Sequence, residues 1–291
     1  MILNFLNSRI ILIFLFPFIL GSLTVFSFQP YNLNYINFII IPLFFLITTY
    51  VQKKSKNTYR RKPYLLNLFL IGYLFGIGFF LTGTHWISNS LTFDENFSFL
   101  IPVAIIGMPI FLGIFFGIGN LIAGPFLQNN FTSILLFSSS FAFMDYVRAK
   151  IFSGFPWNLW SYTWSWKPET LQSLPYLGFF AFNLLCIFIY STPLLLLFNK
   201  KKINLWLFFL ITFIFFGNYI YGSSVIKIND KKLANLQLNS ENSIYMKIIS
   251  PNFDLKYSLS NTDLEKNISN LIKYSEPEVN KKTLFIWPEG V

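Results

Sequence analysis

The chain has 291 residues, of which 54% are hydrophobic and only 12% are charged, and its mean hydropathy is +0.54. A soluble domain carries about a quarter charged residues, so this composition excludes a protein that is water-soluble throughout. The net charge of +10 does not indicate nucleic-acid binding, because the Lys and Arg residues lie between apolar runs, where membrane topology places them. The single cysteine, Cys186, excludes an intrachain disulfide.

Seven hydrophobic stretches are long enough, or nearly so, to cross about 30 Å of hydrocarbon, which takes roughly 20 apolar residues. We interpret the first of them as a retained span rather than a signal peptide, because no small-residue cleavage site follows it. The spacing Gly-x-x-x-Gly occurs at Gly72 and Gly113, where it favours close helix packing within the chain over dimerisation. The predicted spans are Ile10–Phe28, Tyr35–Val51, Tyr64–Leu81, Phe99–Gly124, Phe131–Val147, Tyr176–Phe198 and Ile203–Tyr221.

The charges of the loops predict one orientation for all of these spans. Basic residues cluster at 53–62, between the second and third spans, and at 200–202, between the sixth and seventh. The alternate loops hold few basic residues, so the positive-inside rule places the N-terminus and both clusters in the cytoplasm. Seven crossings then put every residue after Tyr221 on the outer face of the membrane.

The tail from Lys227 onward is polar and has a different pattern. Ile244–Ser250 and Thr283–Trp287 have the composition of strands. Between them, Thr262 and Glu265 read as a capping box that opens an amphipathic helix, which Pro277 ends. Strand, helix and strand begin an α/β unit whose two strands are expected to be parallel neighbours. Such a short piece cannot cover a sheet on both faces, so we expect a soluble domain that is cut short.

Few residues in this sequence have the character of a reactive site. Glu289 follows the second predicted strand, at the end where α/β sheets place their sites, and it is either a general base or an ordinary turn carboxylate. Asp145 and Arg148 share one face of the fifth span, as a functional or a structural pair. His85 is the only histidine and Cys186 lies within a span, so neither a histidine metal site nor a Ser-His-Asp triad is expected, and no cofactor is implied.

Three groups of residues together resemble one family. The first is Gly-Thr-His-Trp-Ile at 83–87, and the second runs from Asp145-x-x-Arg148 into Ser-Gly-Phe-Pro-Trp at 153–157. The third is Pro-Asn at 251–252, which leads through Lys-Tyr at 256–257 to Trp-Pro-Glu at 287–289. In this order they resemble the N-terminal part of the bacterial apolipoprotein N-acyltransferases, and the resemblance covers essentially the whole chain.

The resemblance implies a polytopic α-helical membrane bundle at 1–221, followed at 222–291 by the incomplete start of an α/β nitrilase-like (α-β-β-α) domain. It also implies a multi-pass protein of the bacterial inner membrane whose C-terminal domain is periplasmic. The family moves a fatty acyl chain from a phospholipid, through a cysteine thioester, to the diacylglyceryl-cysteine of an apolipoprotein. These two lipids and the membrane are the implied partners, with no cofactor and no nucleic acid.

The family's catalytic triad is Glu, Lys and Cys, and only the Glu maps onto this chain, at Glu289. The Lys and Cys are expected beyond Val291, so we expect the 291 residues alone to be inactive. Arg148, Phe155, Trp157 and Tyr257 map onto substrate-binding positions. Tyr257 departs from the family, which usually has Trp there, and this puts its role in the acyl site in doubt.

Three other functions remain open from the sequence. A catalytically inactive membrane module that binds lipid or a partner would keep the spans and the aromatic loop. A nitrilase-like amidase on a membrane anchor would explain Glu289 but not the density of aromatic residues after Arg148. A transporter is expected to carry more paired intramembrane charges than Asp145 and Arg148.

Overall fold

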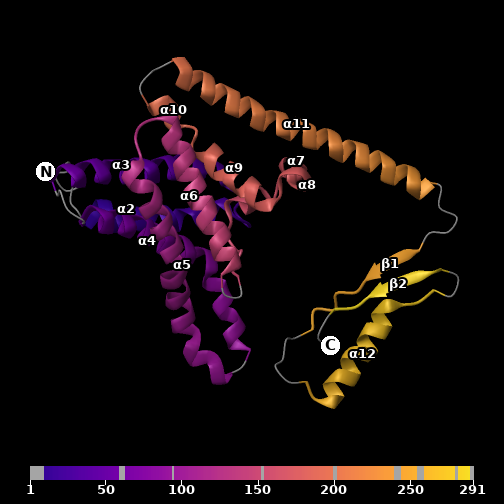
Figure 1. Cartoon of the computed structure of the whole chain (residues 1–291). Helices are drawn as coiled ribbons and strands as arrows, with labels where there is room; N and C mark the ends of the chain where they lie inside the picture. Colours follow the sequence, from indigo (N-terminus) through magenta and orange to yellow (C-terminus); the bar gives the residue numbers. More distant parts are fainter. Residues whose placement is uncertain are drawn as a thin grey trace. The chain divides into compact units, whose positions relative to one another are not determined.

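The computed structural model describes residues 10–58, 63–93, 95–151, 154–198, 202–238, 244–253, 259–278 and 281–288 (Figure 1). Its contacts divide the chain into two compact units. One unit comprises Met1–Ser88 and Leu100–Val225, and the other comprises Asn89–Phe99 and Ile226–Val291.

Helices make up the first unit, and turns of 3-10 helix lie between several of its long helices. The long elements are η1 (Ile10–Leu15, a π-helix) running into α2 (Phe16–Leu23), α3 (Asn37–Thr58), α4 (Pro63–Thr84), α5 (Ile101–Ala123), α6 (Phe131–Lys150), α9 (Phe179–Ser191) and α11 (Lys202–Leu238). Three single turns of α-helix are α7 (Pro168–Leu171), α8 (Leu174–Leu177) and α10 (Leu194–Leu197). The 3-10 turns are η2 (Thr24–Ser27), η3 (Asn34–Ile36), η4 (His85–Thr92), η5 (Glu95–Leu100), η6 (Gly124–Phe126) and η7 (Trp160–Trp164).

Among the described residues, six helical segments are long and apolar enough to cross a membrane. They are Ile10–Ser27, Asn34–Lys54, Tyr64–Thr92, Asn96–Phe126, Phe179–Leu197 and Lys202–Asn235. Each corresponds to a predicted span. The predicted span Phe131–Val147 does form a helix, α6, but its serines and the charges at Asp145, Arg148 and Lys150 dilute its hydropathy. A seventh crossing therefore stays a prediction.

Helix α11 runs further than its predicted span, which ended at Tyr221. It continues without a break to Leu238, because the stretch after Lys227 holds several Lys and Leu residues, which favour helix. The boundary between the two compact units falls inside this helix, between Val225 and Ile226.

Helices α4 and α5 approach each other closely because glycines face the contact. A Cβ atom at Gly72 would lie 2.4 Å from the backbone oxygen of Phe116, and one at Gly76 would lie 2.8 Å from the Cα of Gly113. No larger side chain fits at either position unless the helices move apart. The two Gly-x-x-x-Gly motifs thus serve packing within the chain, as predicted.

Aromatic rings fill the centre of this bundle. Phe44 on α3 stacks on Phe75 of α4, with ring centroids 4.2 Å apart, and meets Phe137 and Phe141 of α6 edge-on. All four side chains are buried. Helix α6 therefore packs inside the bundle, and its C-terminal end holds the candidate site.

The second unit takes in the end of α11 and parts of η4 and η5, and its described residues also form a two-stranded sheet and the helix α12. Strand β1 (Tyr245–Ile248) pairs in parallel with β2 (Thr283–Ile286), and α12 (Asn261–Ser275) connects them. The strand-helix-strand order and the parallel pairing confirm the prediction. The predicted cap at Thr262 is wrong: Ser260 is the N-cap, and its Oγ accepts from the backbone N–H of Asp263 at 3.1 Å. Ser260 satisfies the same capping rule as Thr262 and begins the helix two residues earlier.

Candidate functional site

After the C-terminal end of α6, the chain turns back at a glycine. Gly154 has φ +80°, and a Cβ atom there would lie 2.6 Å from the backbone oxygen of Ala149, so this position requires glycine. The next residue, Phe155, donates its backbone N–H to the carbonyl of Arg148 at 3.1 Å. The loop that follows α6 therefore runs back alongside the last turn of the helix.

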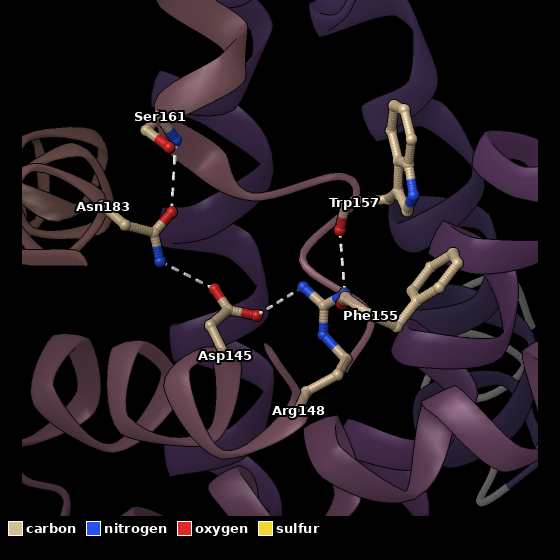
Figure 2. Close-up of polar contacts among 6 residues, drawn as sticks. All are labelled: Asp145, Arg148, Phe155, Trp157, Ser161 and Asn183. Atoms are coloured by element: carbon tan, nitrogen blue, oxygen red, sulfur yellow. Dashed lines mark hydrogen bonds and ion pairs between the residues drawn. The ribbon is translucent and has the colours of Figure 1, made fainter. Parts of the chain in front are cut away.

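The side chain of Arg148 fastens this loop to the helix (Figure 2). Its Nη1 donates to the backbone carbonyls of Phe155 and Trp157 at 2.7 and 2.8 Å. Its Nη2 donates to Oδ1 of Asp145 at 3.0 Å, which confirms the predicted pairing of the two charges. The ring of Phe80 lies 5.0 Å from the guanidinium, at cation–π distance. The planar fork of the guanidinium lets this one side chain serve two carbonyls and a carboxylate together.

Asn183 of α9 completes the network from a third segment. Its Nδ2 donates to Oδ2 of Asp145 at 2.9 Å, and its Oδ1 accepts from the backbone N–H of Ser161 at 3.2 Å (Figure 2). Both Asp145 and Asn183 are buried. The sequence analysis did not single out Asn183. An amide within the apolar run Phe179–Ser191 indicates a polar contact inside the bundle and could have identified it.

The network is nearly sealed from solvent and carries balanced charge. The exposed fractions of the Arg148 and Asp145 side chains are 0% and 4%. Since opposite charges face each other at hydrogen-bond distance, neither is left unpaired in the apolar interior. Burial raises the pKa of the nearby Tyr162 phenol above its ordinary value, and the Arg148 guanidinium partly offsets this rise.

A hollow of about 190 Å³ lies beside the network. Four side chains of α5 between Met108 and Phe115 line one side of it, and Arg148, Ile151, Gly154 and Phe155 line the other. Apart from Arg148, the described side chains that line it are apolar, so its chemistry suits an alkyl chain.

The structure brings two of the predicted substrate-binding residues together at this hollow, Arg148 and Phe155. Trp157 is not among its lining residues. Its side chain is 52% exposed and its ring lies edge-on to Trp86, with centroids 5.7 Å apart. Tyr257 and Glu289, the predicted acyl-site aromatic and the predicted base, lie outside the described residues.

In the second unit, the residue that opens the Trp-Pro-Glu motif is held by the end of α12. Trp287 donates from Nε1 to Oγ of Ser275 at 3.0 Å, and Lys247 donates from Nζ to the Ser275 carbonyl, also at 3.0 Å. A cation at a helix C-terminus satisfies carbonyls that lack partners within the helix. The end of β2 is thus anchored to α12 just before the predicted catalytic position.

The remaining candidates have local structural roles. Among the described residues, His, Cys, Asp and Glu form no group of three that could hold a metal ion. Nδ1 of His85 lies 2.9 Å from the carbonyl of Thr82, at the end of α4. Cys186 is 0% exposed within α9, where it packs as a small apolar side chain.

Together, the apolar helices define a multi-pass membrane protein whose bundle carries a buried charged network beside an apolar hollow. Residues 20–192 match the family model of the apolipoprotein N-acyltransferase N-terminal domain, and the chain belongs to this family. This confirms the resemblance drawn from the sequence motifs.

Curated relatives agree with the family match. The chain is 26% identical to an apolipoprotein N-acyltransferase of Brucella melitensis over 281 residues, which cover 94% of this chain and 50% of that protein. It is 30% identical to one of Sinorhizobium medicae over 181 residues, or 62% of this chain and 34% of that protein. It is 33% identical to one of Rhizobium rhizogenes over 129 residues, which cover 44% of this chain and 24% of that protein. The chain spans about half the length of the Brucella relative.

Proposed function

We propose that the protein is an apolipoprotein N-acyltransferase of the bacterial inner membrane. It takes a fatty acyl chain from a phospholipid and transfers it to the N-terminal diacylglyceryl-cysteine of a lipoprotein. The observation that carries this proposal is the family match over residues 20–192, which contain the Arg148 network and the hollow. The network fixes the aromatic loop at the end of α6, and the hollow offers apolar walls to an acyl chain.

In the proposed chemistry, Glu289 accepts the proton of a cysteine thiol other than Cys186, and the thiolate attacks the ester carbonyl of the phospholipid. The carbon–oxygen bond of the ester breaks, the lysophospholipid leaves with a proton, and a thioester forms. The free amine of the lipoprotein then attacks the thioester. An amide forms, the carbon–sulfur bond breaks and the thiol is restored. A lysine stabilises the oxyanion in both steps.

Labelled phospholipid tests this covalent step. The protein, expressed from its complete reading frame in membranes, is incubated with phospholipid that carries a radioactive acyl chain. We expect label on the protein that hydroxylamine releases, because hydroxylamine cleaves thioesters. The variant Cys186→Ala should be labelled as the natural protein is, because Cys186 is enclosed within α9. Failure of the natural protein to take label, or loss of label in Cys186→Ala, would contradict the proposal.

The proposed topology places the N-terminus in the cytoplasm and the segment after α11 in the periplasm. Six crossings would return the chain to its starting side, so this topology needs α6 as a seventh. At 20 residues α6 is about 30 Å long, enough for one crossing. Its Asp145 and Arg148 neutralise each other, which lowers the cost of burying charge at membrane depth.

Reporter fusions test this topology directly. Fusions at Lys56 and Lys201 should give a cytoplasmic signal, and fusions at Asn96, Trp160 and Asn239 a periplasmic one. A cytoplasmic signal at Asn239 would mean that α6 does not cross.

A further inference from the structure

The chain that follows the loop at the end of α6 returns to the interior of the bundle. Leu159, Trp160 and Ser161 are each at most 2% exposed, and the ring of Trp160 lies on that of Phe79 in α4, with centroids 5.3 Å apart. Leu159 is extended, and the 3-10 turn η7 begins at the next residue. The backbone N–H groups of this segment are shut off from water, so they need acceptors inside the protein.

Asn183 caps the N-terminal end of η7 from another helix. The first N–H groups of a helix have no acceptor within it, and Leu159, at the cap position, has an alkyl side chain that cannot accept. Oδ1 of Asn183 accepts from the N–H of Ser161 at 3.2 Å instead. A side chain of α9 thus serves a turn that lies 22 residues earlier in the chain.

The two ends of the Asn183 amide are committed to different segments, so one orientation of the amide fits (Figure 2). A carboxylate only accepts, so Nδ2 donates to Oδ2 of Asp145, and a backbone N–H only donates, so Oδ1 faces Ser161. Asp145 in turn pairs with Arg148, whose Nη1 holds two backbone carbonyls of the loop. The loop 155–161 is therefore held at both ends by hydrogen bonds that meet at Asn183.

We propose that Asn183 is a positioning residue for the loop 155–161. It acts through Arg148 at one end of the loop and through Ser161 at the other, and it keeps the loop where Phe155 lines the hollow. The consequence for acyl transfer rests on the proposed function. The effect on the loop is measured without any acyl transfer.

Hydrogen exchange of the purified protein in detergent tests the position of the loop. Asn183→Leu removes both hydrogen bonds at similar volume. We expect exchange in 155–161 to become about tenfold faster, the effect of one lost buried hydrogen bond, while α3 and α5 keep their natural rates. Cys186→Ala changes a buried side chain three residues further along α9 and should leave the loop as it is in the natural protein.

Thermal unfolding checks that both variants fold. Natural exchange of the loop in a folded Asn183→Leu would overturn the proposal, and so would a rise of equal size in every helix, because that is general destabilisation. If Asn183→Leu does not fold, the natural protein decides: the Ser161 amide should exchange at least about tenfold more slowly than an exposed amide, and exchange at the exposed rate would overturn the proposal.

The kinetics of thioester formation test the consequence for the reaction, in protein expressed from its complete reading frame. For Asn183→Leu we expect the half-saturating phospholipid concentration to rise about tenfold and the maximal rate to change less. The reason is that a loop in its binding position for only a fraction of the time weakens apparent affinity by that fraction. An unchanged concentration with a loosened loop would overturn the consequence for the reaction. If the natural protein forms no thioester, the proposed function fails, and hydrogen exchange still decides the role of Asn183.

Discussion

Replacing Arg148 with Met is expected to lower the stability of the membrane bundle by about 3–5 kcal/mol, because it leaves the Asp145 carboxylate buried without a cation. The same change removes the donors that hold the carbonyls of Phe155 and Trp157. Thermal unfolding of the purified protein in detergent measures the loss. The stability of Arg148→Lys should lie between that of the natural protein and that of Arg148→Met. A lysine pairs with Asp145 but does not reach both carbonyls as the planar guanidinium does.

A double variant separates the charge effect from the loss of the loop contacts. Asp145→Leu together with Arg148→Met removes both charges, so we expect it to be more stable than Arg148→Met alone. Maleimide labelling of Trp157→Cys in a Cys186→Ala version of these 291 residues, which then has no other cysteine, measures how accessible the loop is. Labelling should speed up in both variants that lack Arg148. A single Arg148→Met variant that is as stable as the natural protein would contradict the structural role of the pair.

Glu289→Gln is expected to slow formation of the acyl-thioester by at least about 10²-fold in the protein expressed from its complete reading frame, because the amide cannot accept the thiol proton. Glu278→Gln is the matched control: it changes an exposed carboxylate of the same unit that pairs with Lys281 at 2.6 Å, and it should leave the rate unchanged. If Glu289→Gln forms the acyl-thioester at the normal rate, Glu289 is not the base but an ordinary turn carboxylate.

The sequence predicts the parts of this fold that follow from local pattern. Runs of apolar residues locate the six described helices that are able to cross a membrane. After Lys227, a strand pattern, an amphipathic helix pattern and a second strand pattern locate β1, α12 and β2. The exact ends are less predictable. Helix α11 runs on to Leu238, and α12 starts from Ser260, because neighbouring residues satisfy the same helix-forming and capping rules.

The candidate site is predictable only in part. The spacing of Asp145 and Arg148 places both on one helix face and predicts their ion pair. The spacing does not reveal that Arg148 donates two hydrogen bonds to backbone carbonyls, because a backbone acceptor leaves no pattern in the sequence. Nor does it show that Asn183, on another helix, meets Asp145, since that contact depends on how α6 and α9 pack.

Arg148 has a structural role beside the substrate-binding role that the sequence predicts for it. The residue lines the hollow, and two of its hydrogen bonds hold the loop. Its Nε is buried and has no hydrogen-bond partner among the described residues.

The most direct test of the proposed function is the chemistry of a lipoprotein N-terminus in living cells. A bacterial host is depleted of its own apolipoprotein N-acyltransferase and supplied with the complete reading frame of this protein. Mass spectrometry of the N-terminal peptide of an abundant lipoprotein then shows whether the amine is free or acylated. We expect a third, amide-linked acyl chain on that cysteine. A lipoprotein that keeps a free amine, in cells whose membranes contain the protein in amounts comparable to the depleted enzyme, would contradict the account.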